Sequence, residues 1–198
     1  MGILASIRER IGNVIAAVIG AVVLLGCGVL FLVVLAPKQK QQAIHIEALP
    51  LMDASTVAFA ASSEEILITG YLHGQPISGA GQYIAYSLDE WDVTPADSDE
   101  PDDEPSGSWK EIERLVPLLD LDVGGQRVVI QSNNEAYMNG PLHEEVEGSG
   151  AYLSADYGST NLSDGSLRYR GFYEGDLTTV WGQKASVEGI IPKELFSG

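Results

Sequence analysis

Three pairs of carboxylates are spaced so that the two acids of each pair could act together as acid and base. The pairs are Asp120 with Asp122, Glu174 with Asp176, and Glu144 with Glu145. Acid–base work needs environments that separate the two pKa values. Asp120 and Asp122 alternate along a predicted strand and share its outward face. Glu174 and Asp176 flank a turn glycine, where acids are common for backbone reasons. We therefore predict structural roles and no catalytic residue.

Residues that bind metals or act as nucleophiles are sparse. His45, His73 and His143 lack the spacing of a metal-binding motif, and the only cysteine is Cys27. The acidic run Asp97–Glu104 lacks the Gly and Glu that an EF-hand calcium loop needs at its sixth and twelfth positions. The chain has neither a phosphate-binding glycine loop nor a GxSxG motif. We expect no metal, no cofactor and no enzyme activity.

Net charge restricts the partners that the chain can bind. From Pro37 onward the chain carries nine basic and twenty-seven acidic residues, which gives a formal charge of −18. A surface this acidic repels nucleic acid and favours a basic protein surface. Tyr83, Tyr86, Trp91 and Trp109 could stack on bases, but stacking without a basic groove gives little affinity for nucleic acid. We interpret these aromatic residues as an interaction surface for proteins.

The elements that position these residues begin with a membrane segment. No charged side chain occurs between Ile11 and Leu35. A helix formed by these residues would be longer than the roughly 30 Å hydrocarbon core of a bilayer is thick. We predict an N-terminal flank at 1–10, a single transmembrane helix in the lipid bilayer at 11–36, and a polar stalk at 37–43. Because the domain that follows has few cationic residues, we expect it on the extracytoplasmic side of a cell membrane.

Two features of the membrane segment leave alternatives open. Leu24–Cys27 resembles the lipobox at which bacterial lipoproteins are cleaved and lipidated, although the chain stays apolar after Cys27, where a polar tether usually follows. Gly12, Ala16 and Gly20 recur every four residues, so they would form a small-residue stripe against which another helix could pack. Gly and Ala are also common in membrane segments that have no such interface.

The remaining residues, 44–198, predict one acidic domain of about six strands without βαβ alternation. The predicted strands are 44–46, 65–72, 82–88, 117–123, 126–131 and 177–182. Asp53 is expected to cap a short helix, and Gly124–Gly125 to form a hairpin turn. The Pro-, Asp- and Ser-rich residues 92–108 predict a disordered, solvated loop. This pattern favours an all-β fold, a small barrel of the oligonucleotide/oligosaccharide-binding (OB) type or a sandwich.

Five motifs follow one another along this domain. They are Ile68–Gly70, Pro76–Gly79 with Gln82–Tyr86, Trp109, Leu119–Ile130 (LxDxxGxxxV) and Glu174–Gly182 (EGDxVxVxG). In this order they resemble the GIDE-type, or "beside a membrane", domain of the mitochondrial ubiquitin-ligase family and its shorter prokaryotic relatives. The resemblance covers Ala43–Ser186 and implies a β-rich protein-interaction domain beside membrane helices. The zinc-binding RING of the ligases has no counterpart in this sequence, so ubiquitin transfer is not implied.

Together these features predict a single-pass, membrane-anchored, non-catalytic protein-interaction domain at the membrane surface. Its expected partners are other membrane proteins or a basic protein surface. The alternative is a structural accessory subunit built permanently into a larger membrane complex. A permanent subunit should expose a large apolar patch when isolated, whereas a transient binder should not.

Overall fold

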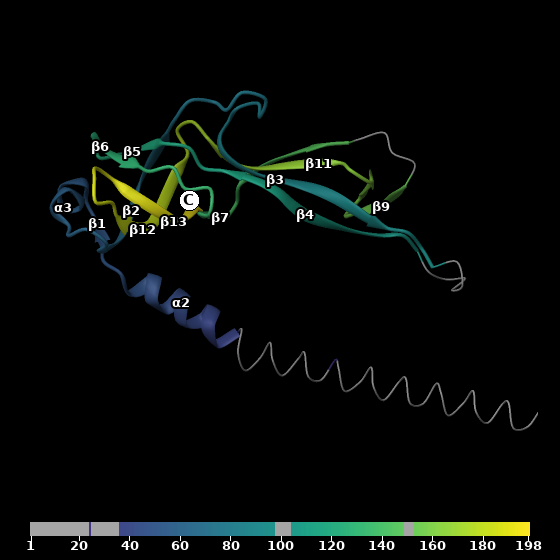
Figure 1. Cartoon of the computed structure of the whole chain (residues 1–198), viewed down its shortest axis with the longest axis horizontal. Helices are drawn as coiled ribbons and strands as arrows, with labels where there is room; N and C mark the ends of the chain where they lie inside the picture. Colours follow the sequence, from purple (N-terminus) through teal and green to yellow (C-terminus); the bar gives the residue numbers. More distant parts are fainter. Residues whose placement is uncertain (1–23, 25–35, 98–103, 149–152) are drawn as a thin grey trace, which may run out of the picture. The chain divides into compact units, whose positions relative to one another are not determined.

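The computed structural model describes residues 24, 36–97, 104–148 and 153–198 (Figure 1). The chain divides into two compact units, Met1–Ala48 and Leu49–Gly198. Within the described residues, no helix combines the length and the apolar character needed to cross a membrane. The predicted transmembrane helix, apart from Leu24 and Ala36, lies outside the described residues. So do the predicted small-residue stripe and the lipobox cysteine, namely Gly12, Ala16, Gly20 and Cys27.

Helix α2 (Ala36–Ala48) corrects the prediction for the start of the domain. The predicted stalk at 37–43 and the predicted strand at 44–46 both belong to this helix. Lys, Gln and Ala have high helix propensity, and their run outweighs the strand preference of two Ile residues. The helix ends shortly before Pro50, because proline disfavours a helical residue before it. The β-rich unit therefore begins at Leu49.

Five strands of the second unit pair in a closed ring. They are β2 (Glu65–His73), β5 (Leu119–Val123), β6 (Gln126–Ile130), β12 (Leu177–Lys184) and β13 (Ile190–Ser197). Antiparallel pairing joins β12 to β2, β2 to β5, β5 to β6, and β12 to β13, and a parallel pairing of β6 with β13 completes the ring. Fully buried side chains fill it, among them Ile66, Ile68, Leu121, Ile130, Val180 and Leu195. The predicted all-β character of the domain is confirmed.

Short elements extend the ring at its edges. Strand β1 (Leu51–Met52) runs parallel to β2, and β7 (Tyr137–Asn139) runs parallel to β13. Helix α3 (Ala54–Phe59) is the predicted short helix, and the Asp53 carboxylate caps it by accepting a hydrogen bond of 2.6 Å from the Thr56 amide.

The ring closes at a narrow seam. The parallel pairing of β6 with β13 consists of one residue pair, Ile130 with Ile190. The Gln131 amide donates to the Ile190 carbonyl at 2.8 Å, and its side-chain amide donates to the Glu188 carbonyl at 2.6 Å. The sequence did not predict β13, because Pro192 and the register shift beside it interrupt a regular strand pattern.

Two insertions between ring strands build a second sheet. Strands β3 (Tyr83–Thr94) and β4 (Ser106–Leu115) form a hairpin between β2 and β5, whereas β8 (His143–Glu147) and β11 (Leu167–Tyr173) come between β6 and β12. The strand order is β4-β3-β11-β8, and Figure 1 shows β3, β4 and β11 side by side. The hairpin of β9 (Ser154–Tyr157) and β10 (Thr160–Ser163) packs against β3 through Ala155 and Leu162.

The loop of the β3–β4 hairpin is shorter than predicted. Residues 92–108 were expected to form a disordered loop, but the two strands pair as far as Thr94 opposite Ser106. Trp91 lies opposite Trp109, with the ring centroids 4.9 Å apart. This aromatic pair stabilises the pairing of β3 with β4 at this point, although the composition of these residues alone is typical of a loop.

A buried ion network joins β3 to β11. One oxygen of Asp89 accepts hydrogen bonds from Arg168 Nη2 at 2.7 Å and from the Nε atoms of Arg168 and Arg170 at 3.0 Å each. The Asp89 side chain is 3% exposed and that of Arg168 is 11% exposed. The Arg168 guanidinium also lies 4.3 Å from the centroid of the Trp109 ring. An unpaired charge in such a place is costly, so the network favours one register of β3 against β11.

Replacing Gly125 by valine should destabilise the domain by about 1–2 kcal/mol, because a β-branched residue rarely adopts a positive φ. The φ of Gly125 is +85°, and nothing lies within 4 Å of an added Cβ, so backbone strain is the expected cause. Deleting Asp97–Glu104, outside the β3–β4 ladder, should leave stability nearly unchanged. Thermal unfolding measures both variants, and equal losses would contradict this strand assignment.

Replacing Asp89 by alanine should lower the free energy of unfolding by about 3–5 kcal/mol, because two arginines lose their shared carboxylate. Glu111→Ala is the matched control. It removes a half-exposed partner of Arg114, 2.7 Å away, and should cost less than about 1 kcal/mol. Chemical denaturation measures both, and similar small losses would show that the buried network contributes little to stability.

Candidate functional site

The aromatic residues predicted to form an interaction surface lie mostly inside the domain. Tyr83, Tyr86 and Trp91 are buried, and Trp109 is half-buried beside Trp91. Burial, together with a hydrogen bond to Glu113, raises the pKa of Tyr86 to about 12. The prediction is wrong for the three buried residues. The alternation along β3 correctly indicated two faces, but between Tyr83 and Asp89 both faces are covered by other parts of the chain.

Asp120 and Asp122 alternate with the buried Leu119 and Leu121 along β5, as predicted. Asp120 lies 2.5 Å from Nη2 of Arg127. Asp122 accepts a hydrogen bond of 2.7 Å from the Gly125 amide and so stabilises the hairpin turn. Both acids line a cavity of about 260 Å³ together with His73. One carboxylate is neutralised by an arginine and the other holds a turn, so both have structural roles.

Two histidine–carboxylate pairs hold the turn between β11 and β12. His73 Nδ1 lies 2.6 Å from one oxygen of Glu174, and His143 Nε2 lies 3.1 Å from Asp176. The Gly74 amide donates to the second Glu174 oxygen at 2.7 Å. The hydrogen bond with His73, followed by that from Gly74, lowers the pKa of Glu174. These bonds fix the turn where the chain passes from the second sheet back into the ring.

A histidine that a carboxylate orients can also act as a general base in catalysis. In the part of the chain that the structure describes, His73 makes no hydrogen bond to a hydroxyl or thiol that it could activate. The sequence did not indicate these pairs, because His73 and Glu174 are 101 residues apart and their contact depends on the strand register. The geometry therefore indicates a structural clamp at this turn.

Glu144 and Glu145 do not act as a pair. They are consecutive on β8, so their side chains leave the strand on opposite faces. Glu145 accepts a hydrogen bond of 2.7 Å from the Tyr173 hydroxyl, and Glu144 accepts one of 3.4 Å from Tyr157. Among the residues described, no group of three or more His, Cys, Asp or Glu is placed to hold a metal ion.

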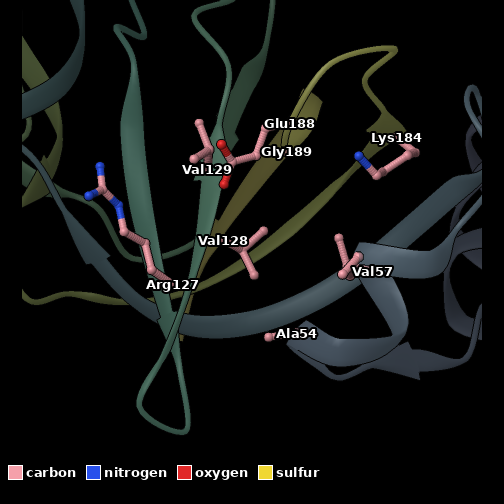
Figure 2. A pocket seen from close by; sticks show the side chains of 9 residues that line it. Ala54, Val57, Arg127, Val128, Val129, Lys184, Glu188 and Gly189 are labelled. Carbon is pink, nitrogen blue, oxygen red and sulfur yellow. The ribbon is translucent and has the colours of Figure 1, made fainter.

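A groove of about 230 Å³ lies between α3, β6 and the connection from β12 to β13 (Figure 2). Its floor is apolar and includes Ala54, Val57 and Val128. Figure 2 shows Val128 with Arg127 on one side and Lys184 on the other. Arg127 pairs with an aspartate of β5, and Lys184 Nζ donates to a backbone carbonyl at 3.1 Å. The groove thus combines an apolar floor with two cations that are already held by the protein.

A glycine brings the β12–β13 connection close to β6 at this groove. Gly189 has a φ of +91°, and an added Cβ would lie 2.1 Å from the Val129 carbonyl oxygen. Any other residue would push the connection away from the strand. The Gly189 carbonyl also accepts a hydrogen bond of 3.0 Å from the Ala185 amide, which closes the turn.

An exposed apolar side chain lies on two of the three elements that flank the groove, α3 and the β12–β13 connection. Phe59, the last residue of α3, is 91% exposed, and Val187, in the β12–β13 connection, is 68% exposed. Exposed apolar residues beside an apolar groove are typical of contact sites for other proteins. Helical spacing could have indicated Phe59, because in a helix that begins after Asp53 it lies off the face formed by Ala54 and Val57, the two residues that are buried.

The His73–Glu174 pair makes a testable contribution to acid stability. The pKa of Glu174 in the folded state lies below its ordinary value of 4.5. The contribution is therefore present above about pH 4.5 and is lost as the pH falls through the lowered folded-state pKa. The pair is half-exposed, so we expect less than about 1 kcal/mol. The stability difference between the native protein and Glu174→Gln should narrow from pH 6 to pH 3. A difference independent of pH would contradict this assignment.

The carboxylates that the sequence singled out are used in ion pairs, turns and hydrogen bonds to tyrosine. The groove with its apolar floor is a surface feature that these contacts do not account for. Comparison of the chain with protein-family models, with curated proteins and with solved structures found no significant match.

Proposed function

We propose that this protein is a single-pass membrane protein whose β-rich domain binds other proteins and has no catalytic activity. The observation that carries the proposal is the apolar groove together with the exposed Phe59 and Val187 on the elements that flank it. An apolar centre within a polar surround is the usual composition of a protein contact site. Attachment through residues 11–36 rests on the absence of charge between Ile11 and Leu35.

Charge indicates which partners would fit. The groove lining carries Arg127, Lys184 and Glu188, whereas the chain from Pro37 onward has a formal charge of −18. A matching partner would place an apolar side chain in the groove and basic residues around it. Other membrane proteins are the nearest candidates for an anchored domain on the extracytoplasmic side. Nucleic acid is disfavoured by the same charge.

The order of strands in the ring supports a more specific proposal for the fold. Numbered along the chain, the first ring strand pairs with the second, the second with the third, the third with the fifth, the fifth with the fourth, and the fourth with the first. This order is similar to that of an OB-like barrel, which binds ligands on its second and third strands. Here these are β5 and β6, and β6 lines the groove. Kinship with the GIDE-type domain is part of the same proposal.

A structural accessory subunit is the second candidate function. It is favoured by the large apolar side chains of the second unit that are more than half exposed, namely Phe59, Val187, Leu51, Leu118, Tyr71 and Tyr137. Permanent interfaces are larger and more apolar than transient ones. In a permanent complex, many of these side chains would be covered by neighbouring subunits.

A photo-crosslinking amino acid tests the groove directly. Placed at Phe59 of the full-length protein in its native membrane, it should give a discrete crosslinked species. The yield of this species should fall by about tenfold when Val187 is also changed to serine. The control position is Ile112 on β4, which is 48% exposed and belongs to the second sheet. Equal crosslinking from positions 59 and 112 would contradict the proposal that the groove is the contact site.

Native mass spectrometry of the gently extracted protein separates the two candidate functions. A stoichiometric complex that survives extraction would identify an accessory subunit. A monomer or homodimer, combined with crosslinking at position 59, would identify a transient interaction domain.

A further inference from the structure

Three polar residues form one row across three strands of the second sheet. Arg114 of β4 lies opposite Ser87 of β3, and Ser87 lies opposite Arg170 of β11. On its other side, Arg170 lies opposite Glu144 of β8. Residues paired on neighbouring strands are about 5 Å apart, and their side chains leave the sheet on the same face. Two guanidinium groups therefore stand on either side of a short hydroxyl side chain.

A cavity of about 260 Å³ is lined by this row and by β7. Residues 137–139 contribute Tyr137, Met138 and Asn139 to the lining. The charged groups of the lining are the two guanidinium groups and the carboxylate of Glu111. The lining thus carries one more guanidinium than carboxylate, and Asp89 of β3 accepts a hydrogen bond from Arg170, in a region whose formal charge is −18.

The two arginines differ in how much of their hydrogen-bonding capacity is already used. Arg114 donates from Nη2 to both oxygens of Glu111, at 2.8 and 2.7 Å, and from Nη1 to the Glu135 carbonyl at 3.2 Å. Arg170 donates from Nε to Asp89 at 3.0 Å. Within the described residues its two terminal nitrogens have no hydrogen-bond partner. Arg170 shares Asp89 with Arg168, whose Nη1 also lies 3.9 Å from Glu144.

We propose that this cavity binds a small oxyanion, a carboxylate or a phosphate, through the two terminal nitrogens of Arg170. A guanidinium presents parallel N–H groups that match two oxygens of either anion. The Arg170 side chain is 36% exposed and so can be reached from solvent, whereas Ser87 is buried. At physiological salt, charges more than about 8 Å apart are largely screened, so the acidic surface does not exclude a short-range contact.

The cavity and the groove are separate sites. The cavity is lined from β3, β4, β7 and β11, and it shares no residue with the groove between α3 and β6. Binding of an oxyanion therefore does not depend on the proposed protein-interaction function. Failure of either proposal leaves the other intact.

Thermal unfolding of the full-length chain in detergent tests the site, followed by the fluorescence of the three tryptophans, Trp91, Trp109 and Trp181. The probes are inorganic phosphate and acetate, each titrated at constant ionic strength. An anion that binds the folded state should raise Tm saturably, by about 3–5 °C at about ten times its Kd. Arg170→Lys keeps the charge but loses the paired donors, so the apparent affinity should fall at least tenfold.

Lys110→Arg is the matched control, because Lys110 is an exposed cation of β4 outside the cavity lining, and the affinity of this variant for the anion should equal that of the native protein. Ser87→Val narrows the cavity without changing its charge and should also weaken binding, which provides a test if Arg170→Lys does not fold. A saturable rise in Tm with either anion supports the site. A rise with only one of them also shows which shape of oxyanion the site accepts. No saturable rise with either anion, or equal affinity in the native protein and Arg170→Lys, would overturn the proposal.

Discussion

The carboxylate of Asp89 is the group on which the second sheet depends. It is buried on β3, and two arginines from β11 share one of its oxygens. A buried charge is tolerated only when its partners are in place, so the strands that supply them must meet in one register. Arg168 carries the constraint further, because it stacks on Trp109 of β4 and hydrogen-bonds the Tyr157 hydroxyl of β9 at 3.2 Å. One acid thus organises elements from both insertions.

This network matters because the second sheet is assembled from chain segments that are distant in sequence. The β3–β4 hairpin leaves the ring after its first strand, whereas β8 and β11 leave it after its third. Nothing local brings β3 to β11, so their alignment relies on side-chain contacts across the sheet. The histidine–carboxylate pairs act at the other end of β11, where they fix the turn into β12. Carboxylates and their partners therefore hold the chain where it passes between the ring and the second sheet.

Local signals in the sequence predicted local structure well. The Asp53 cap, the Gly124–Gly125 turn and the all-β character are confirmed by the structure. Within the second unit, the predictions that were wrong needed knowledge of distant contacts, whereas the stalk and strand predicted at 37–46 were wrong because local helix propensity prevails in α2. Alternation along β3 indicates two faces but not which of them other parts of the chain cover, so the predicted surface at Tyr83 and Trp91 is wrong. The residue pattern of β13 is interrupted by Pro192, and the groove depends on how Gly189 approaches β6 in space.

The single residue pair that closes the ring has a consequence for its dynamics. A parallel contact between Ile130 and Ile190 has few ladder hydrogen bonds, and the Gln131 side chain adds a bond across the same seam. Regions with few backbone hydrogen bonds open locally at a lower free energy than the strands around them. The seam is therefore the place where the ring can open without global unfolding. Glu188 and Gly189, which line the groove, are at this seam, so a bound partner would act on the least cooperative part of the ring.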